Sequence, residues 1–322
     1  MPDKELLRII DLEVQFNTYA GTVKALDGTN LSINRGEWFG LVGETGCGKS
    51  VTAYSILRLI SSPGEIVRGT IFFEGEDLLK KTNEEMRRIR GRKITMVFQD
   101  PLASLNPAFT IGDQIVEALM VQQKSTKSRA VENAKELLSK VGVDTPSKRM
   151  DDYPHELSGG MRQRAMIAMS ISGHPSLLIA DEPTTNVDVT VQRQILDLMK
   201  QLQDTYNTSV LYITHDLGVV AEMCERVAVM YCGNVIESAD VRAIFKNPKH
   251  PYTRGLVNAF PKSTGKKERF EVIPGSVPDL IAPPSGCRFH PRCESCMEEC
   301  SKQRPPEIEV EAGHKVMCYL YT

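Results

Sequence analysis

Apolar and polar positions alternate along the first part of the chain. IIDLEVQF and VKALDGTNLSI combine this period of two with β-branched residues, and the turn-prone segment NTYAG separates them. Successive side chains of a strand point to opposite faces of a sheet, so alternation is typical of half-buried strands. The pattern therefore predicts strands over residues 6–33 that form an antiparallel amino-terminal subdomain.

Farther along the chain, short apolar runs alternate with segments of helical length. WFGLV, TIFFEG, ITMVFQ, LLIAD and SVLYIT are typical of strands, whereas VTAYSILRLI, NEEMRRIR and QRQILDLMKQLQ have helical length and spacing. Strands that alternate with helices predict a mostly parallel sheet covered on both faces. Residues from about 100 to 173 are mostly helical in pattern, and VAVMYCGNVIE predicts a hairpin that turns at Gly233-Asn234.

The character of the sequence changes after about residue 260. PKSTGKKERFEVIPGSVPDLIAPPSG is rich in Pro, Gly, Lys and Ser, and the cysteine-rich segment CRFHPRCESCMEEC follows it. Such composition is typical of a linker or a wrapped tail. We therefore expect a domain over residues 1–260, with a helical subdomain at about 100–173, and an irregular extension over residues 261–322.

Charge and apolar runs limit where the protein works. Lys and Arg number 39 against 41 Asp and Glu, so no overall positive charge indicates nucleic-acid binding. The start MPDKELLRIIDLEVQF has acidic residues where a secretory signal would be basic, and no run reaches the roughly 18 apolar residues that a membrane span needs. We expect a cytosolic protein with reduced thiols.

A phosphate-binding loop follows the strand WFGLV. GETGCGKS fits the pattern G-x-x-x-x-G-K-[ST] between a predicted strand and a predicted helix. Backbone N–H groups of such a loop surround phosphate oxygens, while Lys49 would reach the β- and γ-phosphates and Ser50 would ligate Mg²⁺. The predicted nucleotide-binding residues of this loop are Gly43, Glu44, Thr45, Gly46, Cys47, Gly48, Lys49, Ser50 and Val51.

Cys47 and the acidic pair Asp181-Glu182 each allow a functional and a structural interpretation. Cys47 could have a lowered pKa at the helix N-terminus, or it could be a small residue tolerated because the backbone does the binding, which we favour. The strand LLIAD ends in Asp181 and is followed by Glu182. With a phosphate loop upstream, Asp181 is expected near Mg²⁺ and Glu182 near the γ-phosphate as a base or water-orienting group, rather than as a helix cap.

With LSGGMRQR at residues 157–164, the sequence resembles an ATP-binding cassette ATPase. GETGCGKS, the glutamine of VFQD, LSGGM, LLIADEP, TTNVDVT and ITHD occur in the order typical of that family, over about residues 6–245. The resemblance implies a P-loop NTPase core and two such domains that pair head to tail around ATP. Ser158, Gly159 and Gly160 would then contact the γ-phosphate of an ATP bound to the opposite subunit, and Asp188 would lie at the dimer seam.

The same resemblance assigns further residues. Gln99 would sense Mg²⁺ and the attacking water, and His215 would hold the γ-phosphate and orient Glu182. Tyr19 is the candidate to stack on adenine, with Phe16 as the alternative. The family usually has Ala-Leu before the aspartate, where this chain has Asn186-Val187. This departure could alter communication between the two sites without inactivating them.

QDPLASLNPAFTIGDQI, HPYTRGLVNAFP and the tail IPGSVPDL…PPSGCRFHPRC are similar to the subfamily that powers dipeptide, oligopeptide and nickel importers. That similarity implies an ATPase at the cytoplasmic face of the cell membrane, docked on two transmembrane permeases. Its ATPase partner would be a second, related subunit or another copy of itself, and an external binding protein would deliver substrate.

Two rival functions deserve comparison. A cassette ATPase acting on DNA or ribosomes would carry long coiled-coil insertions or two cassettes in one chain, and neither is present in these residues. A regulatory ATPase that binds without hydrolysing would be expected to lack Glu182 or His215, and both are present. We therefore expect no nucleic-acid partner.

The tail holds five of the chain's 8 cysteines, at 287, 293, 296, 300 and 318. In a reducing compartment they are more typical of metal ligands than of disulfides, whereas Cys224 and Cys232 fit apolar packing. Thiolates suit either Zn²⁺ or a [4Fe–4S] cluster, and the residue types alone leave both open. The subfamily pattern implies an iron–sulfur cluster on Cys287, Cys293, Cys300 and Cys318. Cys296 departs from that pattern as a substitute ligand or an idle thiol. His290 and His314 are possible ligands, but we expect them to be solvated.

Overall fold

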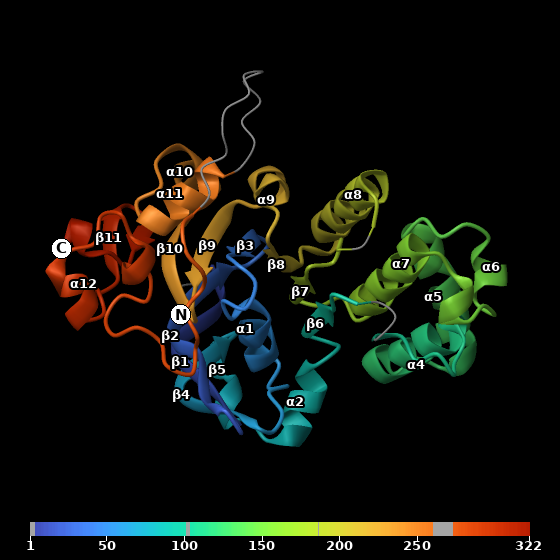
Figure 1. The fold of residues 1–322 in the computed structure, drawn as a ribbon. Helices are drawn as coiled ribbons and strands as arrows, with labels where there is room; N and C mark the ends of the chain where they lie inside the picture. Colours follow the sequence, from blue (N-terminus) through green and yellow to red (C-terminus); the bar gives the residue numbers. More distant parts are fainter. Residues whose placement is uncertain (1–3, 101–103, 186, 260–272) are drawn as a thin grey trace, which may run out of the picture. The chain divides into compact units, whose positions relative to one another are not determined.

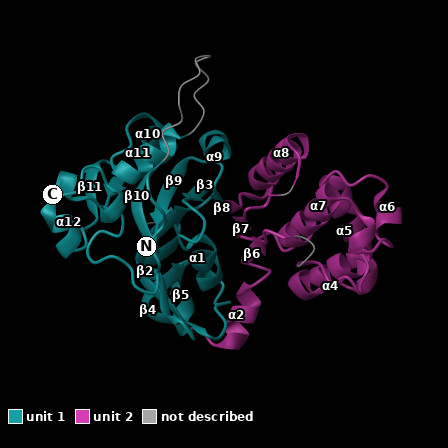
Figure 2. Cartoon of the chain, viewed as in Figure 1, with its two compact units in different colours: residues 1–80, 212–322 teal, residues 81–211 magenta. Residues whose placement is uncertain are grey.

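The computed structural model describes residues 4–100, 104–185, 187–259 and 273–322. The chain divides into two compact units (Figure 2), one of residues 1–80 and 212–322 and the other of residues 81–211. Asn186, at the departure noted above, lies outside the described residues, as do residues 101–103 and 260–272. Parts of the importer-like segments QDPLASLNPAFTIGDQI and HPYTRGLVNAFP therefore receive no structural account.

An antiparallel sheet forms the amino-terminal part of the first unit (Figure 1). Its strand order is β2-β1-β4-β5, from β1 (Glu5–Thr18), β2 (Gly21–Asn34), β4 (Gly64–Phe73) and β5 (Glu76–Asp77). Ile9 lies opposite both Leu31 and Ile71, and all three side chains are buried. The alternating pattern and the turn after residue 18 are confirmed, because one face of this sheet is packed in the core.

A second sheet in the first unit has the order β11-β12-β10-β9-β3. Its strands are β3 (Trp38–Val42), β9 (Arg226–Tyr231), β10 (Asn234–Asp240), β11 (Ile308–Glu311) and β12 (His314–Val316). β3 and β9 are parallel, and β3 is buried at every residue, as expected of a strand covered on both faces. The β9–β10 turn lies at Cys232-Gly233, one residue earlier than predicted, because both residues adopt the positive φ that a tight type I′ turn requires.

The carboxyl-terminal extension is more regular than the sequence predicts. β11 pairs with β12, and β12 pairs with β10, so the segment Ile308–Val316 adds two strands to the second sheet. His314 and Val316 are buried while Lys315 is exposed, which is the alternation of a strand with one packed face. The prediction of an irregular tail was therefore wrong for these residues, since three residues of alternation are too few to recognise in sequence.

Short helices complete the first unit. They are α1 (Lys49–Ile56), α9 (Leu217–Met223), α10 (Val241–Lys246), α11 (Pro251–Asn258) and α12 (Glu298–Lys302), with 3₁₀ turns η1 (Leu78–Lys80), η3 (His290–Arg292) and η4 (Tyr319–Tyr321). α1 begins directly after the phosphate loop. η3 and α12 belong to the cysteine-rich segment.

The second unit holds two parallel strands and the helical segment. β6 (Ile94–Val97) and β7 (Leu177–Asp181) pair in parallel and are buried throughout. The other elements are α2 (Asn83–Ile89), α4 (Ile111–Gln123), α5 (Lys127–Lys140), α6 (Pro146–Arg149), η2 (Pro154–Glu156), α7 (Gly159–Ile171) and α8 (Val189–Tyr206). β8 (Ser209–Thr214) crosses the boundary between the units. The predicted helical region and the parallel pairing are confirmed.

A search of the described helices found none with the length and apolar character needed to cross a membrane.

Candidate functional site

The phosphate loop joins β3 to α1 within the first unit. Gly43 has φ +154°, and a Cβ there would lie 2.2 Å from the carbonyl oxygen of Met230. Gly48 is the N-cap of α1 with φ +109°, and a Cβ there would lie 2.9 Å from the carbonyl oxygen of Ala25. Only glycine fits at either position, so neighbouring backbone holds the loop in its turned shape. Thr45 and Gly46, at the tip, are exposed.

Lys49 and the backbone of the loop are held by hydrogen bonds. Lys49 Nζ donates to the carbonyl oxygens of Gly43 at 2.8 Å and Glu44 at 3.1 Å, and the lysine is buried. The carbonyl oxygen of Cys47 accepts from the N–H of Gly233 at 2.8 Å. These bonds place the Lys49 ammonium beneath the loop, and Ser50 and Val51 follow it as the first turn of α1.

Cys47 is a packing residue in this loop. Its side chain is 1% exposed, and burial raises the pKa of the thiol, against the opposing effect of the nearby Lys49 ammonium. A raised pKa disfavours the reactive thiolate. The structure therefore supports the interpretation of Cys47 as a small residue tolerated among backbone contacts.

The two candidates for adenine stacking differ in exposure. Tyr19 lies in the turn between β1 and β2 and is fully exposed, so it is not a packing residue. Phe16 is half-buried on β1 and lies close to Gly64, where an added Cβ would lie 2.5 Å from the Phe16 ring. Its ring is engaged in packing, which leaves Tyr19 the better candidate.

Gln99 and Glu182 meet in the second unit. The parallel register pairs Val97 with Ala180, so the two polar residues each lie two positions beyond the last pair, at the carboxyl ends of β6 and β7. Gln99 Nε2 donates to Glu182 Oε2 at 2.9 Å, and Thr185 Oγ1 donates to the same oxygen at 3.0 Å. Asp181, the last residue of β7, is 2% exposed. The arrangement orients one carboxylate by two hydrogen bonds.

The backbone at Glu182 is strained. Its φ is +46°, in the left-handed region that residues with a Cβ enter at a cost. Such strain is concentrated at functional sites, where the surrounding structure holds the residue in place. Here the buried strand β7 precedes the residue, and the N–H of Thr185 donates to the Glu182 carbonyl oxygen at 3.2 Å.

The LSGGM segment caps a helix. The Ser158 hydroxyl accepts from the N–H of Met161 at 3.3 Å, at the start of α7. A Cβ at Gly159 would meet no atom within 4 Å, whereas one at Gly160 would lie 2.9 Å from Val191 of α8. Gly159 thus presents bare backbone to open space, while Gly160 permits the close approach of two helices.

Asp188 and His215 both lie at or next to the start of a helix. Asp188 Oδ1 accepts from the N–H of Val191 at 2.9 Å and caps α8 in the second unit. His215 is exposed directly after β8, in the first unit, and the next residue, Asp216, caps α9. The structure therefore places His215 in one unit and Glu182 in the other.

Comparison with known proteins decides the family. A family model described as ABC transporter matches residues 26–185, and a model described as the C-terminal region of oligopeptide/dipeptide transporters matches residues 236–300. The oligopeptide transport ATP-binding protein OppD of Bacillus subtilis (strain 168) is 48% identical over 318 residues, which cover 98% of this chain and 88% of OppD. The chain belongs to the ABC transporter family of ATP-binding proteins.

Other relatives of this ABC ATPase agree. The dipeptide transport ATP-binding protein DppD of the same organism is 45% identical over 98% of this chain and 95% of its own length. A dimeric post-hydrolysis structure of the ATP-binding cassette MJ0796 bound to ADP and Pi has a TM-score of 0.67 at 25% identity, covering 74% of this chain and 99% of that one. The predicted family and the cassette fold are confirmed.

The eight cysteines of this ABC ATPase are all free thiols in the structure. Cys224 and Cys232 are buried, as expected of packing residues. Four thiols of the extension line one small cavity, while Cys296 is exposed and lies outside that lining. The four are Cys287, Cys293, Cys300 and Cys318.

Burial governs the protonation of these thiols. It raises the pKa of Cys287 to about 12 and that of Cys293 to about 11, and the neighbouring thiols add to both shifts. In the part of the chain that the structure describes, no three Cys, His, Asp or Glu residues are placed to hold a metal ion. The predicted zinc or iron–sulfur site therefore gains no support from the arrangement of the described residues.

The two histidines of the tail differ from each other. His314 is 2% exposed, and its Nε2 lies 2.7 Å from Glu237 Oε1. The expectation that it would be solvated was wrong, because β12 carries it into the sheet. His290 is half-buried, with Nδ1 2.9 Å from the carbonyl oxygen of Cys287.

Sequence reasoning missed two residues that contact the phosphate loop. The Tyr252 hydroxyl accepts from the N–H of Glu44 at 3.0 Å, and Arg292 forms an ion pair with the Glu44 carboxylate at 2.9 Å. Tyr252 lies in HPYTRGLVNAFP and Arg292 in CRFHPRC, segments that we assigned to the importer subfamily. Neither segment has a spacing that would indicate contact with a loop more than 200 residues away.

Proposed function

We propose that this ABC ATPase powers the import of di- or oligopeptides through a pair of membrane permeases. The observation that carries the proposal is the combined match to the cassette over residues 26–185 and to the oligopeptide/dipeptide transporter C-terminal region over residues 236–300. Relatives named as oligopeptide and dipeptide transport proteins, similar over 98% of the chain, support the substrate class. The nucleotide-binding domain is residues 1–260, followed by the extension over residues 261–322.

We assign the hydrolytic chemistry to residues at the ends of strands. Glu182 is the base or water-orienting carboxylate, and its hydrogen bonds from Gln99 and Thr185 direct one of its oxygens. His215 holds the γ-phosphate. Lys49 and the N–H groups of the phosphate loop neutralise the charge that develops on the phosphoryl oxygens.

Mg²⁺ fits the oxygen donors available. The predicted ligands are the Ser50 hydroxyl, the Gln99 amide oxygen and the Asp181 carboxylate, the last through water. Hard oxygen donors of this kind suit Mg²⁺, which usually keeps several waters and binds through one or two carboxylates plus phosphate. When bound, Mg²⁺ would supply charge neutralisation at the phosphates.

The working unit is a dimer of nucleotide-binding domains at the cytoplasmic face of the cell membrane. Ser158 is exposed, and Gly159 faces open space at the start of α7, as a contact to a partner's nucleotide requires. Asp188 caps the neighbouring helix α8. We propose that the partner is a second, related ATPase, and that an external binding protein delivers the peptide to the permeases.

We also propose a [4Fe–4S] cluster on Cys287, Cys293, Cys300 and Cys318. Their shared cavity supports this choice. Sulfurs around one tetrahedral zinc at about 2.3 Å would lie roughly 3.8 Å apart, whereas cluster cysteines bind separate irons and are spaced more widely. Four thiolates lining one cavity suit either tetrahedral zinc or a cluster, and the similarity of the tail to the importer subfamily favours the cluster. When bound, the cluster would cross-link the extension.

Reconstituted transport tests the import function. The chain is co-purified with its two permeases and sister ATPase, placed in lipid vesicles, and supplied with binding protein and a radiolabelled dipeptide or pentapeptide. We expect ATP-dependent peptide uptake and ATPase stimulation by loaded binding protein. A Glu182→Gln variant should bind ATP and support no uptake. ATPase stimulation by DNA or ribosomes, without uptake, would refute the import proposal.

Elemental analysis tests the cluster. Protein purified without oxygen should contain near four irons and four sulfides per chain and absorb visible light. Cys293→Ser should lose the iron, while Cys296→Ser, at the exposed thiol outside the cavity, should keep it. Stoichiometric zinc, or no metal, would contradict the cluster and leave the ATPase assignment standing.

A further inference from the structure

An arginine of the cysteine-rich extension holds the acidic residue of the phosphate loop. Arg292 Nη1 donates to Glu44 Oε2 at 2.9 Å, and Nη2 donates to Glu44 Oε1 at 3.2 Å. A guanidinium that binds both oxygens of a carboxylate is fixed in direction as well as in charge. Both residues belong to the first unit. The contact therefore links the extension to the nucleotide loop directly.

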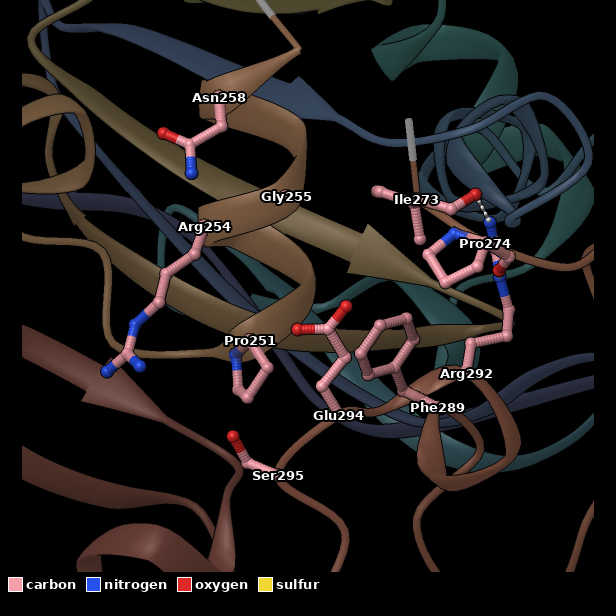
Figure 3. Close-up of a pocket in the computed structure, with 10 residues that line it drawn as sticks. All are labelled: Pro251, Arg254, Gly255, Asn258, Ile273, Pro274, Phe289, Arg292, Glu294 and Ser295. Carbon is pink, nitrogen blue, oxygen red and sulfur yellow. Dashed lines mark hydrogen bonds between the residues drawn. The ribbon is translucent and has the colours of Figure 1, made fainter. Parts of the chain in front are cut away.

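The ion pair is built into its surroundings rather than lying loosely at the surface. The Arg292 side chain is only 6% exposed. Its guanidinium also donates to the carbonyl oxygen of Pro274 at 2.8 Å and to the Tyr231 hydroxyl at 3.2 Å. Figure 3 shows Arg292 beside Ile273 and Pro274, where it lines a cavity of about 440 Å³. An arginine held by this many partners has little rotamer freedom left to lose.

The same region also holds the backbone of Glu44. The Glu44 N–H donates to the Tyr252 hydroxyl. The Tyr252 ring packs against Tyr231, with centroids 4.7 Å apart, and edge-on against Phe289, with centroids 5.4 Å apart. Phe289 and Arg292 belong to the cysteine-rich segment. Glu44 is thus bound through its side chain and its backbone by one packed cluster.

A second arginine of the segment acts at the other end of the loop. Arg288 donates to the carbonyl oxygen of Cys232 and pairs with Asp27 at 3.0 Å. The neighbouring Gly233 N–H donates to the carbonyl oxygen of Cys47. The extension therefore supports the loop at Glu44 directly and at Cys47 through the β9–β10 turn.

We propose that Arg292 is a positioning residue for nucleotide binding, which neutralises the Glu44 carboxylate and keeps it directed away from the phosphates. Glu44 carries a negative charge in a loop whose backbone must receive a polyphosphate of the same sign. Like charges at short range in a partly buried site repel strongly. Pairing with Arg292 removes that repulsion, so the affinity of this ATPase for ATP depends on the extension.

Binding measurements on the purified full chain test the proposal. The probe is a fluorescent methylanthraniloyl derivative of ATP with Mg²⁺, and ATPase kinetics are measured in parallel. We expect Arg292→Gln to weaken binding about tenfold, which corresponds to about 1.4 kcal/mol, and to raise KM with little change in kcat. The defect should shrink at high salt because salt screens the uncompensated carboxylate.

A double variant separates charge from shape. Adding Glu44→Gln to Arg292→Gln removes the unpaired carboxylate and should restore most of the lost affinity. Arg292→Lys keeps the charge without the two-pronged geometry and should lie between wild type and Arg292→Gln. Lys315→Gln is the control, because Lys315 lies on β12 and pairs with Glu307 of the extension at 3.0 Å.

Three results would overturn the proposal. The first is an Arg292→Gln affinity within about twofold of wild type, since the charge would then not matter. The second is a double variant as weak as the single one, which would make the loss structural. The third is an equal loss in Lys315→Gln. If circular dichroism shows Arg292→Gln unfolded, Arg292→Met and its double with Glu44→Gln carry the same comparison.

Discussion

Buried His250 should make the first unit sensitive to mild acid. Its side chain is 1% exposed, and Nδ1 accepts from the N–H of Tyr252 at 3.0 Å at the start of α11. Burial lowers the pKa of His250 to about 4, an effect that Arg254 reinforces and Glu237 opposes. Protonation at Nδ1 would remove the acceptor that caps α11, the helix whose Tyr252 holds the phosphate loop.

The sign and the size of the effect follow from linkage. An unfolded histidine has a pKa near 6.5, so the unfolded chain binds the proton first as the pH falls. The contribution to stability is complete above about pH 6.5 and is lost progressively as the pH falls toward about 4. A gap from about 6.5 to about 4 corresponds to about 3 kcal/mol in total, and about 2 kcal/mol of it is lost between pH 7.5 and pH 5.

Urea denaturation at these two pH values measures the effect. Trp38 is the chain's single tryptophan and is fully buried in the same unit, so its fluorescence reports the unfolding of that unit. The matched variant is His250→Asn, which keeps a side-chain acceptor at the N-cap and cannot titrate. Between pH 7.5 and pH 5, the free energy of unfolding of His250→Asn should fall by about 2 kcal/mol less than that of wild type. Parallel losses in the two proteins would refute the reasoning, because contributions from all other groups cancel in this comparison.

Substitutions at four further residues test the nucleotide site. Glu182→Gln should lower phosphate release at least about 100-fold with ATP binding retained, and an equal loss of binding would contradict its catalytic role. Gly43→Ala, whose Cβ would meet the Met230 carbonyl oxygen, should cost more than about 2 kcal/mol in thermal denaturation. Gly46→Ala also carries the strain of a positive φ, +80°, but its Cβ would meet no atom within 4 Å, so it should cost less, and equal losses would contradict the steric argument. Asp188→Ala should lose about 1 kcal/mol of stability with its helix cap, whereas Asp188→Asn should keep it. If Asp188→Asn lowers ATPase activity at unchanged stability, the role of Asp188 is catalytic as well as structural.

Much of the candidate site could be predicted because its parts are local. The glycines of the phosphate loop, the cap at Ser158 and the acidic end of β7 each depend on residues within a few positions of one another. The hydrogen bond between Gln99 and Glu182 follows from one additional fact, the parallel register of β6 and β7. The left-handed backbone at Glu182 has no sequence signal, because the strain is imposed by the packed strand and the turn after it.

The sequence by itself determined the family, the order of the main strands and helices of the cassette, and the identity of the phosphate loop, since these depend on short motifs and periodic patterns. Only the tertiary structure decided that β11 and β12 join the second sheet, that His314 is buried against Glu237, and that Arg292 pairs with Glu44 across 248 residues of chain. A short-range pattern specifies the conformation of its own segment. Which distant segment it contacts depends on how the whole unit packs its core, and no local spacing predicts that contact.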